Sequence, residues 1–144
     1  MLLDDFDQEL ERRGHRFCRY ANDANVYVCS RRAGERVMAS LTRFLEERLR
    51  LKVNRSKSVV DRPWHCTFLG YTVTNHLRPR LKPAPRSVTR AKDRIRRITH
   101  QGRGRHIRTV ITEINRFTRG WVGYFRLSTV KHQVDGLDHW TRRR

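Results

Sequence analysis

The chain has 144 residues and carries 33 Lys and Arg against 14 Asp and Glu, which gives a formal net charge of +19. This length suits one compact unit or two very small ones. Three cysteines without C-x-x-C spacing argue against a zinc site or a disulfide framework, and neither an apolar leader nor a membrane-spanning run is visible, so we expect a cytoplasmic protein with no membrane partner.

The positive charge is concentrated toward the C-terminus. Residues 1–77 carry 14 basic and 10 acidic side chains, a net +4, whereas residues 78–144 carry 19 and 4, a net +15. Arg accounts for 28 of the 33 basic residues, and its planar guanidinium fits phosphate in two-point contact. A GC-rich genome would explain Arg in place of Lys but not the net charge. We therefore expect a polyanion partner, bound mainly by the C-terminal half.

The chain opens with a helix and a β-hairpin. Apolar residues at helical spacing predict a helix over 2–13, which Gly14 ends. Aromatic and β-branched residues predict strands over 17–20 and 25–29. The intervening Ala-Asn-Asp at 21–23 is typical of a polar turn.

A second helix and further strands follow. The amphipathic segment 30–51 predicts a helix with Ser30 as its N-cap. Residues 52–60 read as a connector or a short strand. Residues 66–74 read as a strand with Gly70 inside it, where another backbone or a ligand could approach closely.

The remainder predicts a basic helical region. Three prolines and no helical period make 78–86 a linker. Ser87 is a candidate cap for a helix with Ile95 in its apolar stripe, and HQGRGRH at 100–106 breaks that helix. A clean apolar stripe from Ile107 to Phe125 predicts a second helix, and a third includes Leu137 and Trp140.

Four motifs occur in order along the chain: FCRYANDANVYV (17–28), LRLKVNRSKS (49–58), FLGY (68–71) and INRFTRGWVGYF (114–125). They resemble, in the same order, the F-x-R-Y-A-D-D hairpin, the motif after the palm helix, the primer grip and the maturase domain of group II intron reverse transcriptases. That last domain is also called the thumb or domain X. Any one match alone is weak, but four in sequence are specific.

The resemblance implies an α+β fold in three parts. Residues 1–77 would be the C-terminal part of a reverse-transcriptase palm, residues 78–86 a linker, and residues 87–144 a basic three-helix thumb or maturase unit. The family's fingers and its other catalytic Asp would lie upstream of Met1, so we expect a truncated or decayed reading frame, or one piece of a split enzyme.

In this family the hairpin carries carboxylates that bind Mg²⁺ for two-metal nucleotidyl transfer. The resemblance makes Asp23 and Asn22 the metal-binding and catalytic positions. Asn22 stands where the family has its first carboxylate, and an amide brings no negative charge, which costs several kcal/mol of metal binding on an order-of-magnitude view. We therefore expect weakened Mg²⁺ binding and no DNA polymerisation by this chain alone.

Three further residues acquire roles from the resemblance. Lys57 could stabilise departing pyrophosphate, although a solvated surface lysine is as compatible with the sequence. Gly70 could let a backbone approach the primer phosphates, although a bulge in a small sheet is equally compatible. Tyr20 could contact a nucleotide.

Nucleic-acid binding has the clearer physical basis, because Lys and Arg contacts to phosphate supply most nonspecific affinity. Arg90, Arg94 and Arg97 are spaced to lie on one side of a helix, opposite its apolar stripe. Taken singly, each arginine reads as a solvated charge; taken as a patch, they favour nucleic acid. Trp121 is expected in the core, and Tyr124 is left open. The candidate phosphate-binding residues are Arg90, Arg94, Arg97, Arg103, Arg105, Arg116 and Arg119.

These observations favour a partial group II intron reverse transcriptase/maturase that binds structured intron RNA, assists its splicing and has lost polymerase activity. A DNA primer would be a further partner. Two alternatives stay open. The chain could complete an active polymerase together with a separate N-terminal fingers and palm polypeptide, or it could be a basic RNA-binding protein unrelated to introns.

Overall fold

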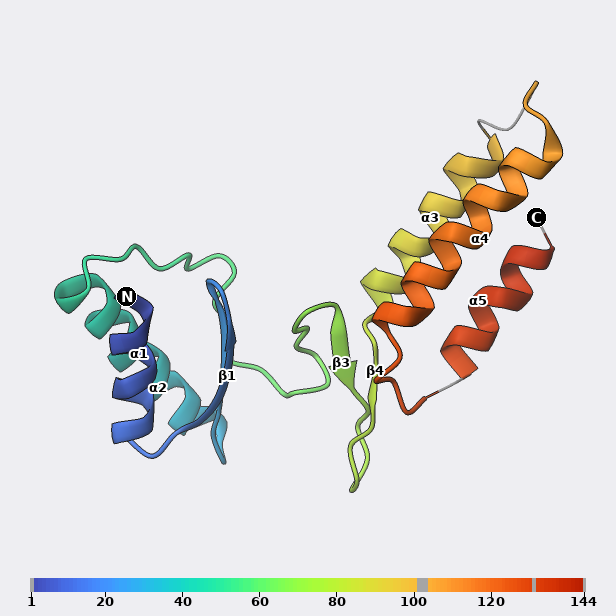
Figure 1. Cartoon of the computed structure of the whole chain (residues 1–144). Helices are drawn as coiled ribbons and strands as arrows, with labels where there is room; N and C mark the ends of the chain where they lie inside the picture. Colours follow the sequence, from blue (N-terminus) through green and yellow to red (C-terminus); the bar gives the residue numbers. More distant parts are fainter. Residues whose placement is uncertain (1, 101–103, 131, 144) are drawn as a thin grey trace. The chain divides into compact units, whose positions relative to one another are not determined.

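The computed structural model describes residues 2–100, 104–130 and 132–143. The chain divides into two compact units, Met1–Arg62 and Pro63–Arg144. The described residues form five α-helices, one π-helical turn and two small antiparallel sheets (Figure 1), so the expected α+β class is confirmed.

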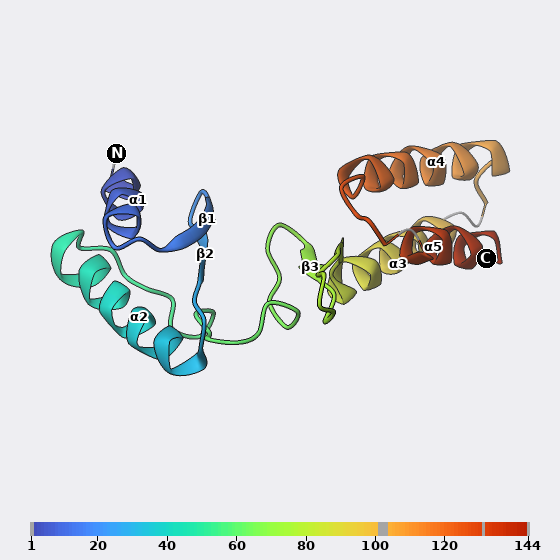
Figure 2. The same cartoon turned by 90° about the horizontal axis from the view of Figure 1, so that it is seen from below.

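The first unit packs two helices on one side of a β-hairpin (Figure 2). Helix α1 spans Leu2–Arg12, strands β1 and β2 span Arg16–Tyr20 and Asp23–Tyr27, and helix α2 spans Arg31–Arg43 before widening into the π-helix η1 at Phe44–Arg48. The apolar stripes of the helices meet the inner face of the hairpin because burying both removes apolar surface from water. The buried residues of this core are Phe6, Leu10, Leu41 and Leu49.

The expected boundaries of the first unit are largely confirmed, with one correction at the turn. Gly14 has φ +69 just beyond α1, and the Ser30 hydroxyl caps α2 by accepting a hydrogen bond from the Ala33 amide at 3.2 Å. The turn, however, holds two residues rather than three. Tyr20 pairs with Asp23, so Asp23 begins β2, and Ala21 takes the left-handed backbone, with φ +51, that closes so short a loop.

Ion pairs form within α1 and between α1 and the hairpin. Glu9 accepts hydrogen bonds from the Arg12 guanidinium at 2.8 Å and from Arg13 Nε at 2.7 Å, and these bonds, Arg12 first, lower the pKa of Glu9 to about 2. On the hairpin side, Arg19 forms a two-point contact with Asp7 and also donates to the Ala21 carbonyl oxygen at 3.1 Å. Arg19 therefore fixes the turn to α1.

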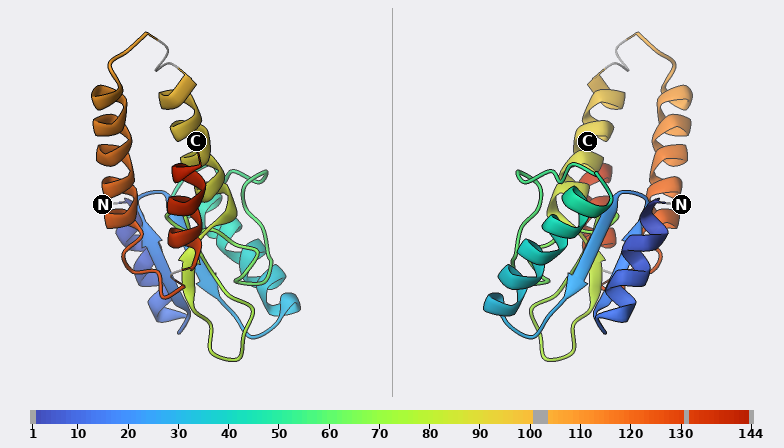
Figure 3. Two further views of the ribbon diagram at one scale, coloured as in Figure 1. Left: turned by 90° about the vertical axis from the view of Figure 1, so that its right-hand side faces the viewer. Right: turned by 90° about the vertical axis from the view of Figure 1, so that its left-hand side faces the viewer.

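The second unit is a small hairpin joined to three helices (Figure 3). Strands β3 and β4 span Tyr71–Val73 and Leu81–Pro83, and helices α3, α4 and α5 span Pro85–His100, Ile107–Tyr124 and His132–Arg142. Trp121 is buried in the core, as expected. The other buried members of that core are Ala91, Ile95, Phe125 and Leu137.

Three local expectations for the second unit need correction. The stretch 78–86 is not only a linker, because Leu81–Pro83 pairs with β3 as strand β4. Helix α3 begins at Pro85, whose fixed φ suits a first helical position, so Ser87 lies inside its first turn and is not the cap. Gly70 lies before β3 rather than within a strand. It forms a two-residue turn with Leu69, and both have positive φ, +77 and +51.

No helix in residues 2–100, 104–130 or 132–143 is both long and apolar enough to span a membrane.

Candidate nucleic-acid interface

The hairpin tip carries one carboxylate and one amide. Asn22 lies in the turn and Asp23 begins β2, and both side chains are exposed. Within the described residues, no three His, Cys, Asp or Glu side chains gather into a group that could hold a metal. A two-metal centre needs several hard oxygen ligands that carry negative charge. Asn22 and Asp23 alone do not fit such a centre, so they support no catalytic step by themselves.

Tyr20 and Lys57 are both accessible. Tyr20 is 64% exposed at the end of β1. Lys57 is exposed on a turn organised by Asn54, whose carbonyl oxygen accepts from the Lys57 amide at 3.1 Å and from the Ser58 amide at 3.0 Å. The residues 52–60, read as a connector or strand, thus form an irregular connector with this turn.

Gly70 contacts the chain's own helices. A Cβ atom added there would lie 3.1 Å from Ser87 Oγ and 3.3 Å from Phe125 Cζ. The Gly70 carbonyl oxygen accepts from the Ser87 hydroxyl at 2.9 Å and from the Ala84 amide at 2.8 Å. The close approach expected at Gly70 therefore involves the Phe125 ring and the start of α3.

Two tyrosines fasten the FLGY turn to the end of α4. The Tyr71 hydroxyl donates to the Tyr124 carbonyl oxygen, and the Tyr124 hydroxyl donates to the Leu69 carbonyl oxygen at 2.9 Å. Their rings stack with centroids 6.0 Å apart. Tyr124, whose role was open, thus has a structural function although its side chain is half-exposed.

Five basic residues of α3 differ in their surroundings. Lys92 and Arg96 lie over the Trp140 ring of α5, at 5.6 and 5.2 Å from its centroid. Arg94 starts from the side of the helix that it shares with Arg90 and Arg97 by its spacing, but its side chain reaches the Glu113 carboxylate of α4 at 3.6 Å. Arg90 and Arg97 are exposed, and none of the described carboxylates pairs with either.

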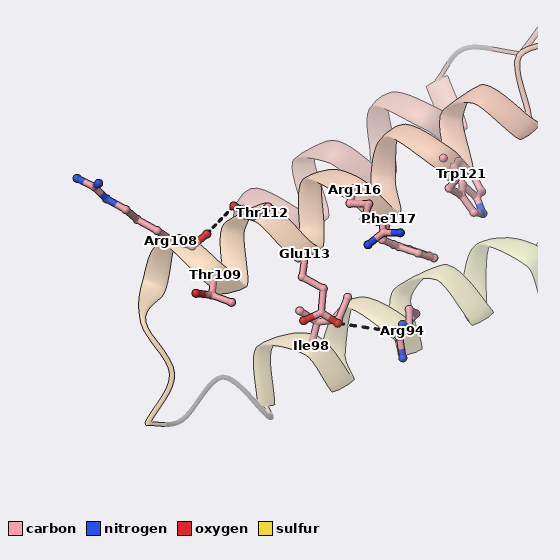
Figure 4. A pocket seen from close by; sticks show the side chains of 10 residues that line it. Arg94, Ile98, Arg108, Thr109, Thr112, Glu113, Arg116, Phe117 and Trp121 are labelled. Atoms are coloured by element: carbon pink, nitrogen blue, oxygen red, sulfur yellow. Dashed lines mark hydrogen bonds and ion pairs between the residues drawn. The ribbon is translucent and has the colours of Figure 1, made fainter.

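A groove of about 910 Å³ runs between α3 and α4 (Figure 4). Apolar side chains, among them Phe117 and the buried Ile98, form part of its lining. Glu113 extends from α4 toward α3 (Figure 4), where it pairs with Arg94 and accepts from both terminal nitrogens of Arg105 at 3.1 Å. Arg116 also lines the groove. One carboxylate thus holds two guanidinium groups at the edge of a partly apolar groove.

The remaining candidates differ in their environments. Arg119 is exposed on α4, and Arg103 lies outside the described residues. His106 caps α4 by accepting a hydrogen bond on Nδ1 from the Arg108 amide at 3.2 Å. Sequence reasoning missed Glu113 and Phe117 as groove residues. Glu113 is the single acidic residue of α4, and that isolation in a basic helix was the available signal.

Comparison with known proteins supports the family resemblance of the C-terminal helices. Residues 88–144 match the family model of the group II intron maturase-specific domain. The match covers α4, α5 and all but the first three residues of α3, and it confirms the resemblance of this part of the chain to group II intron maturases. No curated protein matches the chain.

Proposed function

We propose, from the maturase-specific domain at residues 88–144, that this chain binds structured group II intron RNA and assists its splicing. The observation that carries the proposal is the surface of α3 and α4, where four exposed arginines have no acidic partner among the described residues: Arg90, Arg97, Arg116 and Arg119. Residues 63–144 carry 19 basic and 4 acidic side chains. This unit therefore has the electrostatic character of a phosphate-binding surface. We also propose a cytoplasmic location, which the three scattered cysteines without C-x-x-C spacing favour.

The proposed contribution to splicing is to neutralise the phosphates of an RNA that must fold compactly. Arg90 and Arg97 present their guanidinium groups from a helix that is already formed. The entropy cost of binding is therefore limited to ordering the arginine side chains themselves. Arg116 and Arg119 extend the same character onto α4. Such contacts fix position and affinity, whereas base contacts supply any sequence preference.

A splicing assay tests the proposal. A group II intron transcript that splices poorly at low Mg²⁺ is incubated with and without the purified chain. We expect faster appearance of ligated exons with the chain present, and no effect from an equally basic control protein. Splicing that proceeds at the same rate with either protein would count against the proposal and would favour a basic RNA-binding protein unrelated to introns.

A second candidate function rests on the hairpin at residues 17–28, which keeps Asp23 next to its turn. In this candidate, the chain completes a reverse transcriptase together with a separate N-terminal fingers and palm polypeptide, binds a DNA primer, and uses Asp23, Asn22 and Lys57 for catalysis with Mg²⁺. Co-expression with such a polypeptide, followed by primer extension with the Asn22→Asp variant, decides it. No extension in any combination ends this candidate.

A further inference from the structure

We infer that the groove between α3 and α4 binds an unpaired nucleotide of the RNA, with the base against the apolar lining and the phosphate at the arginines of the rim. The inference rests on the proposed function and deepens it, because it names unpaired rather than duplex RNA as the ligand of this groove. The α3–α4 groove, as we call it, is lined among others by Arg94, Ile98, Thr112, Glu113, Arg116 and Phe117.

The size and lining of the α3–α4 groove suit a flat, partly apolar ligand. Its volume of about 910 Å³ falls within the range of small-molecule sites. Phe117 is half-buried: it packs against the core around Trp121 and still lines the groove. Unpaired bases bind proteins by stacking on aromatic side chains or on guanidinium planes, and Phe117 with Arg116 beside it provides both kinds of surface.

The rim supplies charge complementarity to one phosphate. Glu113 holds Arg94 at 3.6 Å and Arg105 at 3.1 Å, so two guanidinium groups from different segments are brought to one place. Since each guanidinium has five N–H donors, donors are left for a phosphate after the contact with Glu113. Thr109 and Thr112 add hydroxyl groups to the same groove. Glu113 therefore acts as a positioning residue for the rim.

Duplex RNA does not fit this arrangement as well as a single strand does. A duplex presents phosphates on a convex surface with its bases stacked inside, so it cannot place a base in a groove between two helices. The outward arginines of α3 suit phosphates of either form. The apolar lining of the α3–α4 groove can contact a base only when that base is unpaired.

Two glycines of α4 allow a test that changes no charge. Gly120 lines the α3–α4 groove, and Gly123 does not. A Cβ atom added at either glycine meets nothing within 4 Å, and neither needs a positive φ. Leu at each position therefore gains the same helix propensity, but Gly120→Leu places its side chain in the groove.

The experiment measures affinity for a short single-stranded RNA without internal pairing, and for the same strand annealed to its complement. The proteins are the full chain, Gly120→Leu and Gly123→Leu. We expect Gly120→Leu to bind the single strand about tenfold more weakly, in line with the loss of one stacked base, and to keep its duplex affinity, with Gly123→Leu unchanged on both RNAs.

Two results would overturn the inference. Unchanged single-strand binding by Gly120→Leu would remove the α3–α4 groove from RNA recognition, and an equal loss on single strand and duplex would show that the groove does not select unpaired RNA. In both cases the wild-type chain would still bind RNA, so the proposed function would stand. Failure of the wild-type chain to bind the single strand would also overturn the inference, whereas the proposed function fails only if the chain does not bind folded intron RNA.

Discussion

Replacing Arg90 and Arg97 together by Gln removes two exposed positive charges from the outer face of α3. Neither residue pairs with a carboxylate within the described part of the chain, and neither lies in the core of the second unit. The double variant should therefore fold normally and lose only contacts to the ligand. Each phosphate contact contributes about 0.9 to the slope of log affinity against log salt.

Loss of two contacts should make that slope less negative by about 1.8. Over a roughly fourfold rise in salt, from about 50 mM to about 200 mM, the affinity deficit of the variant should shrink by about 12-fold. Filter binding of folded intron RNA across this range measures both slopes. The matched control is Arg32→Gln with Arg36→Gln on α2, which removes the same charge from exposed positions of the first unit. An unchanged slope, or an equal change in the control, would refute the assignment of α3 to phosphate binding.

Three further predictions concern stability. Hydrogen bonds from Arg12 and then Arg13 lower the folded-state pKa of Glu9 from 4.5 to about 2, so the stability that this ion pair gives above pH 4.5 should be lost as the pH falls toward 2. The free energy of unfolding, measured from pH 6 to pH 2, should show this loss, and the loss should be smaller in Glu9→Gln. Gly70→Ala should cost about 1–2 kcal/mol of stability from its positive φ alone, and more because the added Cβ meets Phe125. It should therefore lower the melting temperature more than the control Gly104→Ala, where φ is also positive but a Cβ meets nothing within 4 Å. Equal shifts in melting temperature would contradict the packing at Gly70. Tyr124→Phe should cost about 0.5–1.5 kcal/mol for its hydrogen bond to Leu69 in denaturant unfolding, and no loss would mean that the contact is replaced by water.

Periodic elements were predictable because their signal is local. The stripe of α4 marks Val110 and Trp121 as core residues, and both are buried. The same stripe includes Ile107 and Ile111, yet these are 64% and 49% exposed. Periodicity gives the apolar side of a helix, but it does not say how far the neighbouring helices extend to cover it.

Features that depend on nonlocal packing were not predictable. Leu69 has no preference for a left-handed backbone, and only its docking against α4 makes a two-residue turn there. The direction of Arg94 follows from the position of Glu113, nineteen residues away in the sequence. The α3–α4 groove likewise depends on the separation of two helices, which no single segment encodes.

The most direct test of the central claim is competition binding at graded salt between folded group II intron RNA and duplex DNA of arbitrary sequence. If the second unit is a maturase-type RNA-binding surface, the chain should prefer the folded intron RNA at every salt concentration, and the preference should persist as salt weakens both complexes. Equal affinity for the two nucleic acids would contradict the claim.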